Sequence, residues 1–250
     1  ENVIGIVAKS VLTRVGADFG VELALKKGLR IGTGMGSSAA SAVAAGCAVN
    51  ALLRAPLSES ELLDAILDGE EAVSGRHADN AAPSLHGGLV LITRQSPLEI
   101  RPLPIPDGLQ VVLVSPVFRL DTKTARAVLP EQIDLSNALN QARNMALLVD
   151  ACHRNQAADF LMAANDRFIE KCRLKLIPGA EVAQKRCREL GCPSVFLSGS
   201  GPTMAVPCLQ TDDVQQIREV LMGAFAEAGV DSSSFISRIG APGARRWVVE

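Results

Sequence analysis

The chain has 250 residues, 48% of them hydrophobic, so it can bury a core large enough for one large or two modest domains. Its 25 basic and 27 acidic residues form no long run of one sign, which argues against a nucleic-acid binder. No apolar stretch approaches the roughly 20 residues that a membrane span needs. We therefore expect a soluble protein with a small-molecule partner, no nucleic acid and no membrane.

The first part of the chain alternates predicted helices and strands. A helix pattern over residues 3–15 is followed by a strand over 20–26, in which apolar and other residues alternate. A helix over 37–53 is rich in small residues, so we expect it to pack closely and be buried. Another helix begins at Ser58, which has capping-box spacing to Glu61, and a strand follows over 89–93.

Residues 96–108 contain four prolines and are the predicted boundary between a domain over 1–100 and one over 101–250. The second domain mixes helices and strands, which predicts an α+β fold. The expected strands cover residues 110–115, 194–198, 203–208, 235–239 and 247–249. The expected helices cover residues 124–129, 136–153, 156–172, 178–190 and 214–228. Six scattered cysteines show no zinc-ligand spacing, so we expect reduced, packed thiols.

Residues 32–41 read Gly-Thr-Gly-Met-Gly-Ser-Ser-Ala-Ala-Ser and lead into the helix over 37–53. Glycines leave backbone N–H groups uncovered, and the first turn of a helix adds unpaired N–H groups and a positive dipole end, so the loop can cradle a phosphate. It matches neither the Walker nor the Rossmann pattern. From the pattern alone, a tight, closely packed turn without a ligand is as good an interpretation as phosphate binding. The serine hydroxyls favour the binding of phosphate or magnesium.

This loop resembles the second motif of the GHMP kinases, and residues 198–203 (Ser-Gly-Ser-Gly-Pro-Thr) resemble their third motif. His77-Ala78-Asp79-Asn80, followed by Gly87-Gly88, is similar to the homoserine kinase branch of that family. The resemblance covers nearly the whole chain. It implies a two-domain fold, with a ribosomal S5 domain 2-like N-terminal domain and a ferredoxin-like C-terminal domain.

The resemblance implies that ATP and Mg²⁺ are the cofactors. The implied ATP-binding residues are Gly32, Gly34, Met35, Gly36, Ser37, Ser38, Ser200 and Gly201. Glu70 follows Leu63 and Ile66 at helical spacing, so a helix would carry its carboxylate on the buried face. By resemblance, Glu70 and Ser38 hold Mg²⁺, with Ser37 as the alternative ligand.

By resemblance, His77, Arg126 and Arg173 contact the substrate L-homoserine, and Asn80 supports them. A guanidinium fork suits a carboxylate or a phosphate. Thr122 is a further catalytic candidate beside Glu70, Ser38 and Arg126, although capping a helix is an equal alternative for it. The sequence offers no evident general base, and phosphoryl transfer leaves little work for one.

The first motif of the family, with its homoserine-binding Asn and Asp, is not found in the sequence, so we expect a fragment whose N-terminal domain is incomplete. The implied reaction is ATP-dependent phosphorylation of L-homoserine to O-phospho-L-homoserine in threonine biosynthesis. The alternatives are a non-catalytic nucleotide-binding remnant and a GHMP kinase for another hydroxylated substrate. We expect a cytoplasmic enzyme, or a plastid one in a photosynthetic eukaryote; a homodimer is left open.

Overall fold

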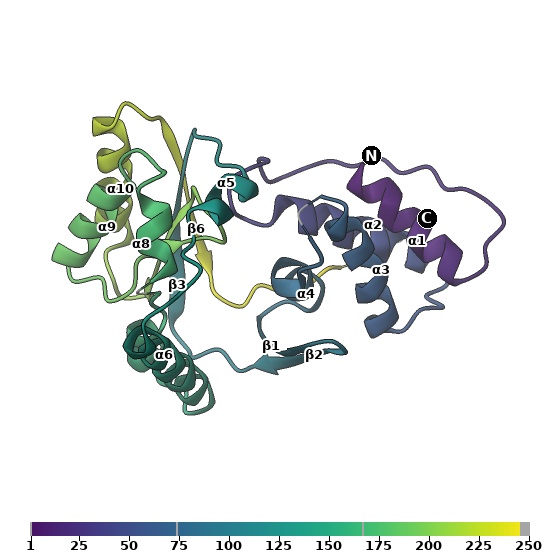
Figure 1. Ribbon diagram of the computed structural model, residues 1–250, viewed down its shortest axis with the longest axis horizontal. Helices are drawn as coiled ribbons and strands as arrows, with labels where there is room; N and C mark the ends of the chain where they lie inside the picture. Colours follow the sequence, from purple (N-terminus) through teal and green to yellow (C-terminus); the bar gives the residue numbers. More distant parts are fainter. Residues whose placement is uncertain (1, 74, 167, 246–250) are drawn as a thin grey trace. The chain divides into compact units, whose positions relative to one another are not determined.

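The computed structural model describes residues 2–73, 75–166 and 168–245, and at residues 122 and 123 it describes the backbone alone (Figure 1). The chain folds into two compact units. The first contains the described residues up to Ile31, Gly36–Pro102 and the described residues from Gly240 onward. The second contains Gly32–Met35 and Leu103–Ile239. Each unit has its own hydrophobic core.

Helices dominate the first unit: α1 Val3–Arg14, α2 Ser37–Leu52, α3 Glu59–Glu71 and α4 Ala78–His86. The first three pack against one another (Figure 1). The small residues bring them close, because a Cβ added at Gly46 of α2 would lie 2.8 Å from the Ile66 side chain, and one at Gly69 would lie 2.4 Å from Val7. The prediction of a buried small-residue helix is confirmed.

The N-terminus of α3 carries the predicted capping box. Ser58 Oγ accepts a hydrogen bond from the Glu61 backbone N–H at 3.4 Å, and Glu61 Oε2 accepts one from the Ser58 N–H at 2.8 Å. This reciprocal pair satisfies donors that the helix leaves unpaired. It fixes the start of the helix, and therefore the face on which residues nearer its end project.

The predicted strand over residues 20–26 is wrong. Val21 and Leu23 pack against the core of the first unit, yet no strand in the described part of the chain pairs with this segment. A strand needs hydrogen bonds to a neighbour, which alternation of apolar residues alone does not supply. Instead, β1 (Leu89–Gln95) pairs with β2 (Leu98–Leu103), a strand that we did not expect inside the proline-rich segment.

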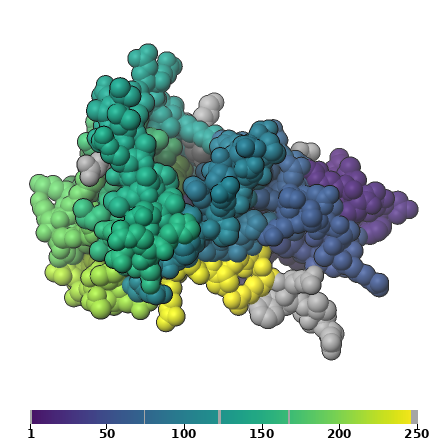
Figure 2. All heavy atoms as spheres, turned by 90° about the horizontal axis from the view of Figure 1, so that it is seen from below, coloured from purple at the N-terminus to yellow at the C-terminus, as the bar shows by residue number. Residues whose placement is uncertain are grey.

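The end of the described chain returns to the first unit. Pro242 forms a β-bridge with Gly87, and the Ala244 N–H donates to the carbonyl oxygens of Ser84 at 3.0 Å and Leu85 at 3.1 Å. Residues 240–245 are the yellow segment against this unit in Figure 2. The contact is so close that a Cβ on Gly87 would lie 2.1 Å from the Gly243 nitrogen.

The second unit is built on an antiparallel sheet in the order β4-β5-β3-β6. Its strands are β3 Leu109–Pro116, β4 Phe196–Leu197, β5 Met204–Leu209 and β6 Ser232–Arg238. Alternate residues of β3 and β5, such as Val112 and Val206, share a core with side chains of the helices that cover the sheet. The expected strand over 247–249 lies outside the described residues.

The helices of the second unit are α5 Thr122–Ala127, α6 Leu135–His153, α7 Ala157–Ala163, α8 Ile169–Leu174, α9 Ala180–Glu189 and α10 Val214–Glu227. The single helix expected over 156–172 is wrong, because the chain leaves the helical path after α7. Asp166 Oδ1 then accepts the N–H groups of Phe168 at 2.7 Å and Ile169 at 2.8 Å, just before α8 begins with Phe168 as its N-cap.

The α+β composition is as expected, and all six cysteines are free. Across the described residues, no helix combines the length and apolar character needed to cross a bilayer.

Candidate active site

The glycine loop has a left-handed backbone at all three of its glycines, with φ of 76° at Gly32, 78° at Gly34 and 68° at Gly36. Other residues adopt this conformation only with strain. A Cβ on Gly34 would also lie 2.3 Å from the Ser198 carbonyl oxygen and 2.5 Å from that of Gly201. Close packing against residues 198–201 therefore requires glycine at position 34, whatever else the loop binds.

The glycine loop and the turn over residues 198–203 are joined by hydrogen bonds within the second unit. Ser198 Oγ donates to the Gly34 carbonyl at 3.0 Å, and the Thr203 N–H donates to the Thr33 carbonyl at 3.2 Å. The half-buried Ser200 lies in the same turn. The structure thus brings together the two segments that resemble the second and third family motifs.

Helix α2 starts directly after the loop. Its N-cap residue is Gly36, which has no side chain to satisfy the first N–H groups of the helix, so these groups can bind an anion. Ser37 is buried, and its hydroxyl donates to the Leu29 carbonyl at 3.1 Å. Lys27 Nζ donates to that hydroxyl at 3.5 Å and places a positive charge near the start of the helix.

Lys27 was missed in the sequence analysis. The only local signal for it is a basic pair, Lys26 and Lys27, a few residues before the loop. Such a pair is usually solvated on the surface, so only the tertiary contact with Ser37 makes Lys27 a candidate for binding phosphate.

Ser38 and Glu70 form the central polar pair of the first unit. Ser38 Oγ donates a 2.8 Å hydrogen bond to Glu70 Oε1, and Glu70 is only 5% exposed, as its helical spacing predicts. Burial raises the pKa of the Glu70 carboxyl, and so does the charge of Asp79, whereas the Ser38 hydrogen bond and Lys27 lower it. Ser38, unlike Ser37, is therefore already directed at the carboxylate.

The chemistry of this pair fits magnesium, a hard cation that prefers oxygen ligands and usually keeps several waters. Within the described ranges, no three or more His, Cys, Asp or Glu side chains gather as a metal-binding group. A cation at Ser38 and Glu70 would therefore take its other ligands from phosphate oxygens and water, as Mg²⁺ does in sites that bind nucleotide phosphates.

His77 occupies the N-cap position of α4 and is exposed, and Asn80 lies one turn into that helix. The Asn80 Oδ1 atom is 3.1 Å from the point where a Cβ on Gly36 would lie. The structure therefore places Asn80 beside the start of α2. It places His77 at the N-cap of α4, without a side-chain cap bond.

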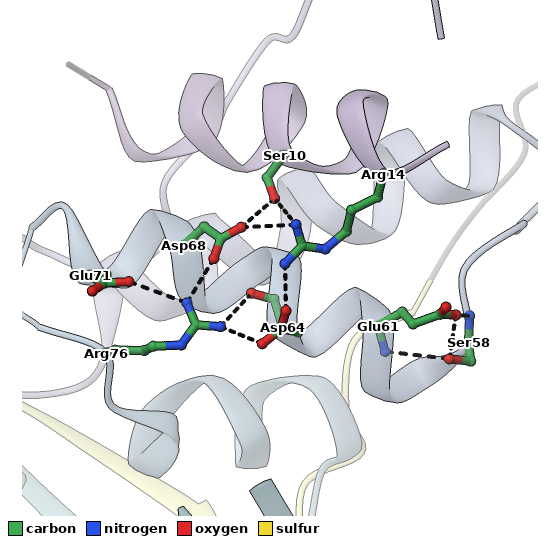
Figure 3. A network of polar contacts seen from close by, with 8 residues as sticks. All are labelled: Ser10, Arg14, Ser58, Glu61, Asp64, Asp68, Glu71 and Arg76. Carbon is green, nitrogen blue, oxygen red and sulfur yellow. Dashed lines mark hydrogen bonds and ion pairs between the residues drawn. The ribbon is translucent and has the colours of Figure 1, made fainter. Parts of the chain in front are cut away.

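An ion-pair network anchors the chain directly before His77 (Figure 3). Arg76 pairs with Asp68 at 2.7 Å, with Glu71 at 3.3 Å and with Asp64, all on α3. Arg14 of α1 pairs with the same two aspartates, and the Ser10 hydroxyl of α1 donates to Asp68. Each partly exposed pair contributes only about 0–1 kcal/mol, but the shared contacts fix the path of the chain into α4.

Arg173 and Arg126 lie on neighbouring segments of the second unit. Arg173 Nε donates to the carbonyl of Ala125, the residue before Arg126, at 3.1 Å, and Arg173 Nη1 donates to the Gly199 carbonyl at 3.3 Å. Arg126 is exposed on α5. The side chain of Thr122 lies outside the described residues, so its catalytic role stays a prediction.

Two family models match the chain: "GHMP kinases N terminal domain" over residues 2–88 and "GHMP kinases C terminal" over residues 137–227. A homoserine kinase of Arabidopsis thaliana is 38% identical over 250 residues, which cover 98% of this chain and 68% of the relative. The chain belongs to the homoserine kinase family of GHMP kinases.

Other homoserine kinases support this assignment. The homoserine kinase of Xylella fastidiosa (strain M12) is 35% identical over 98% of this chain and 76% of its own length. The crystal structure of homoserine kinase from Cytophaga hutchinsonii matches with a TM-score of 0.91 and 33% identity, over 97% of this chain and 77% of that one. The chain is therefore a kinase with the two-domain GHMP fold, as the sequence motifs predicted.

Proposed function

We propose that this member of the homoserine kinase family transfers the γ-phosphoryl group of ATP to the hydroxyl of L-homoserine. The products are O-phospho-L-homoserine and ADP, and the reaction serves threonine biosynthesis. The observation that carries the proposal is the hydrogen bond from Ser38, at the start of α2 directly after the glycine loop, to the buried carboxylate of Glu70. The pair supplies oxygen ligands beside a helix N-terminus that favours phosphate.

In this proposal the ATP phosphates bind the loop and turn residues Gly32, Gly34, Met35, Gly36, Ser37, Ser38, Ser200 and Gly201. Ser38 and Glu70 hold Mg²⁺, which when bound offsets the charge that develops on the phosphate oxygens. Ser38 is favoured over Ser37 because the Ser37 hydroxyl already donates to the Leu29 carbonyl. Lys27 adds a positive charge near the same helix start.

His77, Arg126 and Arg173 are the proposed contacts of homoserine, with Asn80 in support and Thr122 as a further catalytic candidate. Arg173 is bonded to the residue before Arg126, so the two guanidinium groups come from adjoining backbone. Two such groups suit the carboxylate of an amino acid, which each can bind through paired N–H donors.

The proposed chemistry relies on positioning. The substrate hydroxyl oxygen bonds to the γ-phosphorus as the bond to the bridging oxygen of ADP breaks, and the hydroxyl proton passes to the transferred phosphate. A loose transition state needs little help from a base, so alignment and charge stabilisation can supply most of the rate enhancement.

We also propose an ATP-binding domain over 1–100 and a C-terminal domain over 101–250. The compact units depart from this division because Gly32–Met35 belong to the second unit and the described residues from Gly240 onward to the first. The homodimer and the cytoplasmic or plastid location stay predictions.

The reaction can be tested by mass spectrometry of the product formed from ATP, Mg²⁺ and L-homoserine. Mevalonate and galactose in place of homoserine serve as controls for another GHMP substrate. Formation of O-phospho-L-homoserine alone supports the proposal. ATP binding without any phosphorylated product would instead favour a non-catalytic nucleotide-binding protein.

A further inference from the structure

Glu170, the second residue of α8, is a buried carboxylate that the sequence motifs did not single out. It is 4% exposed, and its Oε1 atom accepts a 2.7 Å hydrogen bond from the Leu197 backbone N–H. Its Oε2 atom has no hydrogen-bond partner among the described residues. Burying a carboxyl group is costly, so an apolar side chain would fill this space at lower cost unless the bond to Leu197 has a use.

The helix that carries Glu170 is short. α8 spans only Ile169–Leu174, and so few residues form too few internal hydrogen bonds to hold a helix in place by themselves. Its orientation depends on tertiary contacts. Leu174 packs into the core of the second unit, and Glu170 ties the helix to the last residue of β4.

Arg173 lies three residues after Glu170, so both side chains project from the same side of α8. Arg173 Nη1 donates to the carbonyl of Gly199, two residues beyond Leu197. Helix α8 therefore holds the end of β4 and the following turn at two points. One cavity of about 270 Å³ is lined by Glu170 and Arg173 together with Leu197 and Gly199. The two α8 side chains therefore form part of the wall of this cavity.

We infer that Glu170 is a positioning residue: by holding α8 to Leu197, it sets Arg173 relative to the turn over residues 198–201. That turn is bonded in the same unit to the glycine loop through Ser198 and Gly34. The bond of Glu170 thus acts at the start of a series of contacts that runs from the proposed homoserine arginine to the proposed phosphate loop. The inference rests on the proposed function, because it concerns the homoserine contact assigned to Arg173.

The test is steady-state kinetics of Glu170→Leu, Glu170→Asp and Glu170→Gln in the intact protein. Glu170→Leu removes the hydrogen-bond acceptor, and Glu170→Asp shortens the side chain by one methylene, so that the carboxylate no longer reaches Leu197. In both variants we expect the KM for homoserine to rise about tenfold, because a small misplacement of a binding group has a large effect. The KM for ATP should change less than about threefold, since the loop keeps its own bonds to the turn. Glu170→Gln retains an oxygen acceptor, so its KM for homoserine should equal that of the unsubstituted protein.

Gln184→Leu is the matched control. Gln184 Nε2 is buried on α9 and donates to the Val195 carbonyl at 3.1 Å, two residues before Leu197. Its loss removes a comparable bond to the same segment and leaves the bond between Glu170 and Leu197 in place. We expect a lower melting temperature in this variant and an unchanged KM for homoserine.

Glu170 acts through Arg173 only if their effects overlap. In an Arg173→Ala background, Glu170→Asp should raise the KM for homoserine no further. An unchanged KM in Glu170→Asp, with the unsubstituted protein active and Arg173→Ala impaired, overturns the inference alone, even if Glu170→Leu does not fold. An equal rise in Gln184→Leu also overturns it. Inactivity of the unsubstituted protein with homoserine would contradict the proposed function instead.

Discussion

The hydroxyl of Ser38 donates a 2.8 Å hydrogen bond to the carboxylate of Glu70, which joins the first turn of α2 to the end of α3. Both residues lie in the first unit, and the carboxylate is buried. Burial raises the pKa of this carboxyl, and its hydrogen bond from Ser38 can be exchanged for a cation that both oxygens would bind.

Glu70→Gln should impair magnesium use more than folding. The amide keeps an oxygen that can accept the Ser38 hydrogen bond, but it loses the negative charge that attracts the cation. We expect kcat to fall about 100-fold and the Mg²⁺ concentration for half-maximal rate to rise, because a metal ligand contributes several kcal/mol to the transition state. Initial rates measured over a Mg²⁺ titration check this.

The adjacent Glu71 provides the control. Its side chain is exposed and pairs only weakly with Arg76 at 3.3 Å, so Glu71→Gln should leave the Mg²⁺ dependence unchanged. Identical Mg²⁺ curves for the two variants would contradict the role of Glu70.

Gly34→Ala should destabilise the protein. The new Cβ would meet the Ser198 carbonyl oxygen at 2.3 Å, and the backbone has φ of +78°. We expect the free energy of unfolding to drop by about 2–4 kcal/mol, since the left-handed conformation alone costs roughly 1–2 kcal/mol. Gly28→Ala is the control, because a Cβ there meets nothing within 4 Å. Equal denaturant midpoints for the two variants would show that the loop and turn are not packed as described.

The pH dependence of stability should carry the signature of Glu170. Burial raises the pKa of its carboxyl to about 7, against an ordinary value of 4.5, so between these pH values the folded state holds a proton that the unfolded state has lost. Stability due to this group is therefore greatest below pH 4.5, falls as the pH rises to about 7, and is level above that.

Glu170→Gln removes this dependence. Relative to the unsubstituted protein, the variant should gain up to about 3 kcal/mol of stability between pH 4.5 and pH 8, since one pKa unit corresponds to about 1.4 kcal/mol. Urea titrations of both proteins at several pH values measure the difference. Parallel stability curves would mean that Glu170 titrates normally.

Local rules predicted the parts of the fold and site that depend on neighbours in sequence. The capping box at Ser58 and Glu61 is set by four consecutive residues, and the buried face of Glu70 follows from its spacing to Leu63 and Ile66. The motif resemblance located the segments that meet at Gly34.

Features that depend on distant partners escaped the sequence analysis. Residues 20–26 alternate like a strand but have no strand beside them in the described chain. The contact of Lys27 with Ser37 and that of Glu170 with Leu197 join different elements, and no spacing rule reveals such contacts. The break before α8 lies inside a periodic pattern, where the Asp166 side chain accepts the N–H groups of Phe168 and Ile169.

Asp79→Asn tests the proposed absence of a general base. The charge of Asp79 raises the pKa of Glu70, so the Asp79 carboxylate lies near the proposed magnesium ligands Ser38 and Glu70. Asp79 is therefore the natural candidate for a general base. We expect kcat to fall less than about tenfold, whereas loss of a true base typically costs 10²–10⁴-fold. A loss of kcat above about 100-fold with an unchanged Mg²⁺ dependence would assign the base role to Asp79.

The proposed homoserine kinase activity is tested most directly by the initial rate of ADP release with L-homoserine and Mg²⁺ each present or omitted. We expect rapid release only when both are present, with one O-phospho-L-homoserine formed per ADP. Release that is independent of homoserine, or its absence while ATP still binds, would contradict it.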